Sequence, residues 1–312
     1  MRLGAAIASG PRQRNGKKTK MTTATLIDTP RIEAEPARST TDKPRAPRRY
    51  IYCVIDSDVP GSFGPFLQKG IDGQSEVFAV PHNGIAAVVS ATSRAKLEIS
   101  RGNALAHQRV MEAVMQRGHT VLPVRFNTIA EDKGKSTAAQ RIIDRVLVAR
   151  RDEILGLLTT MRPLVEVGVK GLWTDMEAVF RDIVESSPEI QSLRKKLLPA
   201  GDRGSARKAP TNVTGQIKLG ERVKQALEAG KCGTEAALMR RLRPMATDFR
   251  KNKTFGDPMF ANLALLVEKS RQESVVAVLS AFEAQQAGQV KLRCVGPLPP
   301  CNFLELVITW DD

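Results

Sequence analysis

The chain has 312 residues, of which 42% are hydrophobic but only 4% aromatic, so it can hold two modest domains with apolar cores. Its longest apolar runs, such as Leu263–Val267, fall far short of the roughly 18 residues that a membrane-spanning helix needs. The apolar run at the N-terminus is too short for a secretory signal. The four scattered cysteines include no Cys-x-x-Cys pair, which argues against a zinc site or a disulfide framework and predicts reduced thiols in a cytoplasmic protein.

The formal net charge of +15 is concentrated near the N-terminus. Residues 1–49 hold 12 Lys and Arg against four acidic residues, a net charge of +8, together with five prolines and no sustained hydrophobic period. Low hydrophobicity with high net charge predicts a disordered basic tail. Such a tail can bind phosphate groups, as in a nucleic-acid-binding regulator. A solubilising extension is the commoner case, and we take that interpretation.

Residues 50–162 predict an N-terminal α+β domain built on an antiparallel sheet. An apolar strand is expected over Tyr50–Ile55. Two further strands, over residues 76–80 and 85–90, flank the stretch His82-Asn83-Gly84. Because Asn-Gly readily takes the positive φ values of a tight primed turn, these strands are expected to form a β-hairpin.

A helix and an interrupted strand follow the hairpin. Apolar residues at helical spacing predict a helix from Ser100 to Arg117, with Gly118 as its C-cap. The strand Val121–Phe126 contains Pro123, and proline cannot donate to a sheet ladder, so we expect this strand at an edge. Beyond it, the apolar pattern predicts one long amphipathic helix over residues 139–158.

Residues 163–312 predict a C-terminal domain in which strands alternate with helices, with a basic linker at about 199–214 between helical segments. This order resembles an elaborated ferredoxin-like α+β sandwich, so we expect an α+β protein of two domains. The predicted elements are, in chain order, a strand over residues 165–169, a helix over 176–183, a helix restarted at Ser187-Pro188, helical segments over 217–227 and 238–242 separated by a pause at 230–233, a strand over Met259–Val267, a helix over Glu273–Gln286 and a strand over Val290–Val295.

Two histidines are candidates for acid/base chemistry. His107 lies on the apolar stripe of a predicted helix, and His119 lies beside the edge strand. An enzyme would need both to converge in one pocket with Glu112 and Arg125. A histidine on an apolar stripe more often packs with its ring nitrogens bonded locally, so we interpret both as structural. We predict no enzyme activity and no cofactor.

Two short patterns resemble ligand-binding motifs only weakly. Asp56 and Asp58 form a carboxylate pair, but no Gly-rich calcium loop surrounds them, so a turn is favoured over a metal site. Gly61-x-x-Gly64 lacks the later glycine and the lysine of a phosphate-binding loop. The sequence therefore predicts neither a metal site nor a phosphate site here.

Three residues are candidate partner contacts. Arg125 interrupts an apolar strand and can point to solvent, pair with a carboxylate such as Glu112, or face a partner; pairing is the commonest of the three. Gly296–Pro300 predicts a rigid exit from the sheet, because proline fixes φ. In addition, these prolines would hold Leu298 and Phe303 in an extended surface on which another chain docks.

Six short stretches follow one another along the chain in this order: Tyr50–Tyr52, the helix from His107 to Glu112, His119–Phe126, Val165–Lys170, Asn262–Val267 and Gly296–Phe303. In this order they resemble the gas vesicle protein L/F family, over about residues 50–308. Two positions depart from the family pattern. Asn127 stands where the family commonly has glycine, and asparagine tolerates positive φ. Cys301 stands where an aromatic residue, usually tyrosine, precedes Asn-Phe, so an aromatic anchor is missing.

The resemblance implies a cytoplasmic accessory protein of gas vesicle formation that associates with the vesicle and lacks a membrane span. The implied partners are the small hydrophobic shell protein and other gas vesicle accessory proteins. A shell subunit with a gas-facing apolar surface aggregates unless a partner covers that surface or directs its addition. We therefore expect binding that assists shell assembly or nucleation, with or without retention as a minor vesicle component. A nucleic-acid-binding regulator would instead need a basic, aromatic-bearing face on the folded part.

Overall fold

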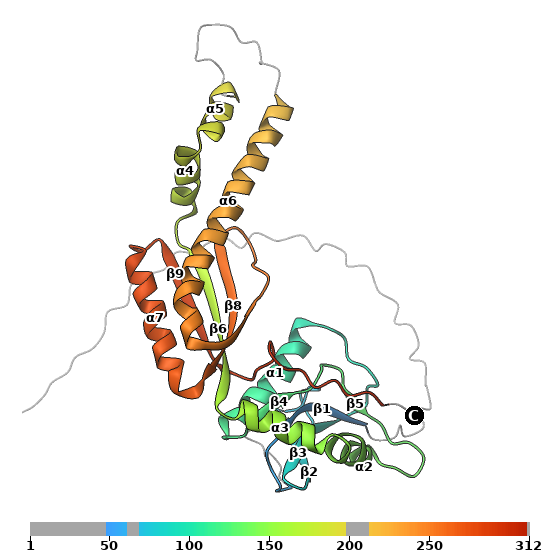
Figure 1. The fold of residues 1–312 in the computed structure, drawn as a ribbon. Coiled ribbons are helices and arrows are strands. Elements are labelled where there is room, and N and C mark those ends of the chain that lie inside the picture. The colour runs from blue at the N-terminus through green and yellow to red at the C-terminus, as the bar shows by residue number, and fades with distance from the viewer. Residues whose placement is uncertain (1–47, 61–68, 198–211, 311–312) are drawn as a thin grey trace, which may run out of the picture. The chain divides into compact units, whose positions relative to one another are not determined.

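The computed structural model describes residues 48–60, 69–197 and 212–310 (Figure 1). It shows helices packed on two antiparallel sheets, which confirms the predicted α+β class. All but the last two residues of the predicted tail at 1–49 lie outside the described part.

Two other predictions fall wholly or mostly outside the described residues. Gly61-x-x-Gly64 is one of them, and the linker predicted at about residues 199–214 is the other. The described chain resumes at Asn212, which caps the next helix.

The first sheet has the strand order β2-β3-β1-β4, with β5 also beside β1, and its neighbouring strands are antiparallel. The predicted hairpin is present. Asn83 and Gly84 join β2 to β3 with φ angles of 46° and 88°, the positive values of a primed turn. The strands are β1 (Arg48–Ile55), β2 (Val77–His82), β3 (Ile85–Thr92), β4 (Val121–Pro123) and β5 (Ile129–Ala130).

Strand β1 is buried on both faces, because helices cover the first sheet from two sides. Tyr50 and Tyr52 belong to the core formed with α1 (Arg101–Gln116). Ile51 and Val54 belong to the core on the other side. Alternation along a strand sends neighbouring side chains to opposite faces, so one apolar strand supplies both cores.

The helix predicted over residues 139–158 is interrupted. It consists of α2 (Ala138–Ile142), a π-helical segment over Ile143–Val148 and α3 (Arg151–Met161). Arg150 leaves helical geometry, with φ −117° and ψ 20°. The apolar residues of all three pieces still pack in one core of the first sheet, so their periodicity predicted the burial but not the break.

The proline-containing strand β4 ends at Pro123, three residues earlier than predicted. Pro123 lies opposite Cys53 at the end of the strand order, which confirms the expected edge position. The open side of this edge is met by the C-terminal part of the chain. Leu306 donates its backbone N–H to the Pro123 carbonyl at 2.7 Å, and its own carbonyl accepts the N–H of Arg125 at 3.0 Å. The edge proline thus needs no donor of its own.

The second sheet has the strand order β7-β8-β6-β9, again with antiparallel neighbours. The helices α6 and α7 pack on its apolar face. Strand β7 was missed by the sequence prediction, because its residues are polar or half-buried and do not alternate as an inner strand does. The elements are β6 (Leu164–Trp173), β7 (Ala246–Lys251), β8 (Met259–Glu268), β9 (Val290–Leu298), α6 (Val213–Leu242) and α7 (Gln272–Gln285).

Helix α6 runs without a break through Gly230–Gly233, so the predicted pause there is wrong. A helical glycine costs about 1 kcal/mol relative to alanine. Packing offsets this cost, because Lys231 is buried and donates to Glu228 and to the Gly256 carbonyl at 3.0 and 3.3 Å. The N-terminal part of α6 contacts α4 (Met176–Ser186) and α5 (Pro188–Leu197), and the three helices form an arm beyond the second sheet (Figure 1).

Candidate partner-binding site

The end of β9 and the residues after it carry two of the predicted partner contacts. We call Val295–Phe303 the proline segment. A Cβ atom placed on Gly168 of β6 would lie 3.8 Å from Leu298 Cδ1 and 4.0 Å from Val295 Cβ, so both side chains flank this glycine. Leu298 is half-buried, and Val295 is 51% exposed. The segment thus presents apolar side chains at an edge strand of the second sheet.

A buried carboxylate holds the far end of the proline segment. Glu166 of β6 accepts hydrogen bonds from the backbone N–H of Asn302 at 2.9 Å and from its side-chain amide at 2.6 Å. Burial raises the pKa of Glu166 above its usual value. The neighbouring Phe303 is half-buried, and the guanidinium of Arg250 lies 5.4 Å from its ring centre.

Arg125 forms an ion pair within the chain. Its Nε donates to a carboxylate oxygen of Glu305 at 2.9 Å, and both side chains are about half exposed. Glu112, the pairing partner suggested by the sequence, instead accepts a hydrogen bond from Gln108 at 2.7 Å. Arg125 therefore links the loop after β4 to the C-terminal part of the chain.

His107 lies in a buried aromatic cluster with Tyr50, Tyr52 and Phe126, with ring centres 5.6–5.8 Å from its own. Its Nδ1 is 2.9 Å from the Tyr50 hydroxyl, and its ring also bonds the backbone of Val124. Burial lowers the pKa of His107 to about 4, so the ring is neutral at pH 7.

His119 has different neighbours. Its Nδ1 lies 3.4 Å from the Asp56 carbonyl oxygen and 3.9 Å from the Asp56 carboxylate. Asp56 also accepts the Thr120 backbone N–H at 2.8 Å, and Asp58 accepts that of Gly84 at 3.0 Å. The two aspartates thus bond backbone groups at turns, as the sequence favoured. Within the described ranges, no group of three or more His, Cys, Asp or Glu could hold a metal ion.

Asn127, the first departure from the family pattern, takes the positive φ expected of it, at 69°. Its side chain accepts from the backbone N–H of Leu97 and donates to the Leu97 carbonyl, both at 2.8 Å. These two bonds hold the loop after β4 against the segment before α1. A glycine would supply the same φ but neither bond.

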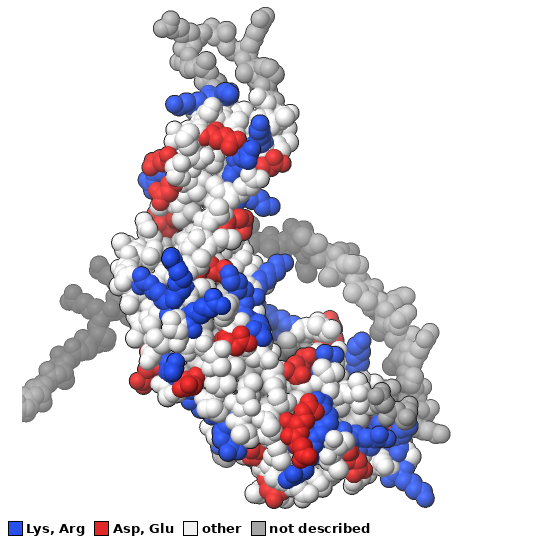
Figure 2. All heavy atoms as spheres, in the orientation of Figure 1, with Lys and Arg blue, Asp and Glu red and all other residues white. Residues whose placement is uncertain are grey.

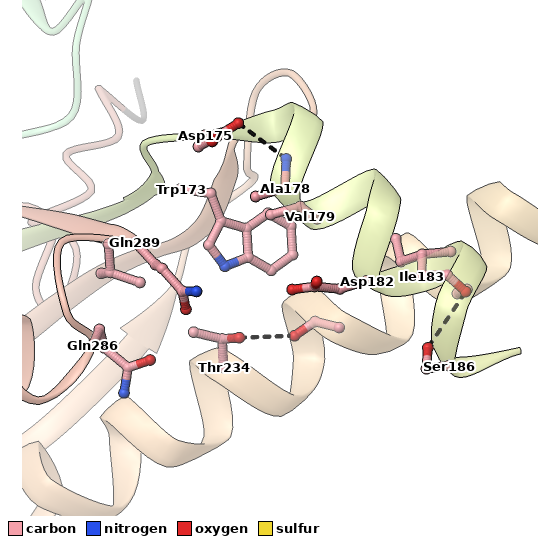
Figure 3. A pocket seen from close by; sticks show the side chains of 13 residues that line it. Trp173, Asp175, Ala178, Val179, Asp182, Ile183, Ser186, Thr234, Gln286 and Gln289 are labelled. Atoms are coloured by element: carbon pink, nitrogen blue, oxygen red, sulfur yellow. Dashed lines mark hydrogen bonds between the residues drawn. The ribbon is translucent and has the colours of Figure 1, made fainter.

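A pocket at the base of the arm was missed by the sequence analysis. It has a volume of about 370 Å³ and lies between α4, α6 and the turn that leads into β9. Figure 3 shows the indole of Trp173 on one wall, with the side chains of Asp182 and Gln289 directed toward the pocket. The lining residues are Trp173, Asp175, Ala178, Val179, Asp182, Ile183, Ser186, Ala226, Gly230, Thr234, Gln286, Gln289 and Val290.

Lys and Arg side chains gather near the sheet end of α6, whereas the arm carries both signs of charge (Figure 2). Arg240 and Arg241 form the last turn of α6, and the guanidinium of Arg241 lies 5.2 Å from the ring centre of Phe282. In the part of the chain that the structure describes, no helix is both long and apolar enough to cross a membrane.

Comparison with known proteins gives a consistent result. The family model described as gas vesicle synthesis protein GvpL/GvpF matches residues 48–305. Gas vesicle protein F of Streptomyces sp. (strain CB03234) is 29% identical over 256 residues, 82% of this chain and 99% of that protein. Gas vesicle protein F of Microcystis aeruginosa (strain PCC 7806) is 21% identical over 83% of this chain and 98% of that protein.

Solved structures share the fold. The crystal structure of GvpF from Anabaena sp. PCC7120 superposes with a TM-score of 0.65 at 19% identity, over 83% of this chain and 98% of that one. That of GvpF from Microcystis aeruginosa gives a TM-score of 0.60 at 20% identity, over 83% and 99% of the two chains.

Proposed function

This chain belongs to the gas vesicle synthesis protein GvpL/GvpF family, and from that membership we propose that it binds the small hydrophobic shell protein and assists shell assembly or nucleation. The matched region leaves out only the N-terminal tail and the last few residues. We place the protein in the cytoplasm, in contact with the growing vesicle and with other accessory proteins. The role is one of binding and not of catalysis.

The exposed apolar edge at the proline segment is the observation that carries this proposal. Val295 is 51% exposed and flanks Gly168 together with Leu298, on β9, the edge strand of the second sheet among the described residues. A sheet edge with apolar side chains is a surface to which another extended chain can add. A shell subunit also needs such a partner, because its gas-facing surface is apolar and aggregates when left uncovered.

Phe303 and Arg125 have separate parts in this proposal. Phe303 is a separate candidate contact, because its half-buried ring packs with Arg250 of β7, at the other end of the strand order from β9. Arg125 pairs with Glu305 of the C-terminal part of the chain and contacts the partner only at its exposed side.

We also propose that the described chain forms two domains. We assign residues 50–162 to an N-terminal α+β domain and residues 163–298 to a ferredoxin-like domain. The strand order β7-β8-β6-β9, with α6 and α7 on one face, supports the second assignment, since it follows a βαββαβ chain. Residues 299–310 were expected with the second domain, but Leu306 and Trp310 pack in a core of the first sheet.

Co-purification with the shell protein tests the function. Val295→Asp places a charge on the exposed apolar edge, and Val276→Asp does the same at a 49% exposed site on α7 as the matched control. We expect Val295→Asp to retain far less shell protein than wild type. Val276→Asp should retain as much shell protein as wild type does. A buried apolar side chain contributes about 1.5–3 kcal/mol, which corresponds to a loss of affinity of roughly tenfold or more.

The salt dependence of the same assay identifies the force involved. Apolar burial is not weakened by added salt, whereas screened charges lose their attraction. Retention that persists at several-fold higher salt supports the proposal. Equal retention by both variants, each checked for a wild-type melting temperature, would refute the docking edge, and retention lost at moderate salt would show an electrostatic interaction instead.

A further inference from the structure

The pocket at the base of the arm has a charge opposite to that of the chain as a whole. The chain carries a formal net charge of +15, yet the charged residues that line the pocket are Asp175 and Asp182, with no Lys or Arg among them. Asp175 caps α4 by accepting the Ala178 backbone N–H at 3.0 Å. The Asp182 side chain has no hydrogen bond or ion pair with another described residue, and Figure 3 shows its carboxylate directed toward the pocket.

The remaining walls combine an aromatic face with aliphatic and amide groups. The Trp173 indole is half-buried and packs on Phe260 with a ring-centre distance of 5.8 Å. A Cβ atom on Gly230 would lie 3.6 Å from the indole, so α6 passes close to it at this glycine. A volume of about 370 Å³ is within the range of ligand pockets, which is about 300–1,000 Å³. An aromatic face beside a carboxylate attracts a cation.

Helix α4 gives the pocket an extended apolar border. The helix is amphipathic, but none of its residues is buried. Val179 and Ile183 line the pocket, and Met176 and Phe180 are only half-buried. An apolar helix face of this kind normally packs against a partner. An occupant that covered it would extend along α4 and would be larger than a small amine.

We propose that this pocket binds a Lys or Arg side chain of a partner polypeptide, flanked by aliphatic residues that pack along α4. The cation lies between the Trp173 indole and the Asp182 carboxylate, with Asp175 adding to the negative potential. The aliphatic neighbours cover Val179 and Ile183. This inference goes beyond the proposed function, and the pocket is a contact distinct from the proline segment.

The test uses the full chain with the substitution Trp310→Phe. The chain has two tryptophans, so Trp173 is then the only one left. The probe is acetyl-Leu-Arg-Leu-amide. The matched neutral probe is acetyl-Leu-citrulline-Leu-amide, which keeps the shape of arginine without its charge. Binding is followed by the fluorescence and by the indole N–H NMR signal of Trp173. We expect saturable changes with the arginine peptide and an affinity roughly fivefold to tenfold lower for the citrulline peptide.

Protein variants test the two carboxylates. In Asp175→Asn/Asp182→Asn the charges are removed, and the fold is retained because asparagine caps a helix as well as aspartate does. This variant should bind the arginine peptide roughly fivefold to tenfold more weakly. The control Glu185→Gln changes an exposed carboxylate of the same helix that does not line the pocket, and it should bind as wild type does.

Three results would overturn the proposal: no saturable change of either Trp173 signal, equal affinity for the two peptides, or unchanged binding by the double variant. If arginine amide alone bound as tightly as the tripeptide, the ligand of the pocket would be a small cation and not a polypeptide. Shell-protein retention by the double variant separates this inference from the proposed function. If the double variant retains the shell protein as wild type does but no longer binds the arginine peptide, both the proposed function and this inference stand. Loss of shell-protein retention in Val295→Asp bears on the docking edge alone.

Discussion

The buried His107 predicts a marked loss of stability in mild acid. Its ring lies in the aromatic cluster of the first sheet, where Nδ1 forms a hydrogen bond with the Tyr50 hydroxyl. Burial lowers its pKa from 6.5 to about 4 in the folded chain. In the unfolded chain it titrates with its ordinary value, so between pH 6.5 and 4 the unfolded state binds more protons. Stability contributed by the neutral ring is therefore present above pH 6.5 and is lost as the pH falls toward 4.

The magnitude follows from the two pKa values. One pKa unit corresponds to about 1.4 kcal/mol. Lowering the pKa from 6.5 to about 4 therefore means that the free energy of unfolding falls by about 3 kcal/mol in total as the pH is lowered through this range. About 2 kcal/mol of this is lost between pH 7 and pH 5. That amount is a large fraction of the 5–15 kcal/mol that stabilises an ordinary domain.

Urea unfolding of wild type and His107→Gln at pH 7, 6 and 5 measures this term. The variant should be less stable by about 1–2 kcal/mol at pH 7, since it loses ring contacts with Tyr52 and Phe126. It should draw level with wild type by pH 5, because glutamine does not titrate. Tyr50→Phe is the control, since it removes the two hydrogen bonds of the Tyr50 hydroxyl, with His107 and with the Asn127 backbone N–H, but keeps the histidine and should keep the acid loss. Parallel pH dependence of wild type and His107→Gln would refute the reasoning.

Three further substitutions have defined consequences for the free energy of unfolding in urea. Glu166→Leu should cost about 1–2 kcal/mol, because Asn302 loses the acceptor of two hydrogen bonds; a wild-type value would mean that water replaces the carboxylate. Arg125→Ala should cost less than about 1 kcal/mol, as half-exposed ion pairs do, and a larger loss would show that the pair with Glu305 anchors the C-terminal part of the chain. Gly84→Val should cost about 1–2 kcal/mol or more, since valine is strained at φ 88°, and an unchanged midpoint would contradict the primed turn.

Local patterns in the sequence were sufficient where neighbouring residues decide the structure. Asn83-Gly84 determines its turn through backbone sterics alone, and Ser100 and Gly118 mark the ends of α1 through capping. The structural role predicted for His107 follows from its position on an apolar helical stripe, and the ring is indeed buried.

Contacts between distant residues were not accessible from such patterns. Arg125 pairs with Glu305, 180 residues away, and nothing near Arg125 in the sequence indicates that partner. The pocket at Trp173 is formed by α4, α6 and the turn before β9, which the fold alone brings together. The interruption of the helix at residues 143–150 was also missed, because a π-helical segment keeps the same apolar residues buried.

Deletion of the gene in the native host, followed by electron microscopy of the cells, tests the assembly role most directly. An assembly factor for the shell predicts that vesicles are absent or few while the shell protein is still made. Wild-type protein should restore vesicles, Val276→Asp should restore them equally, and Val295→Asp should not. Normal vesicles in the deletion strain would contradict the account, and so would full restoration by a folded Val295→Asp variant.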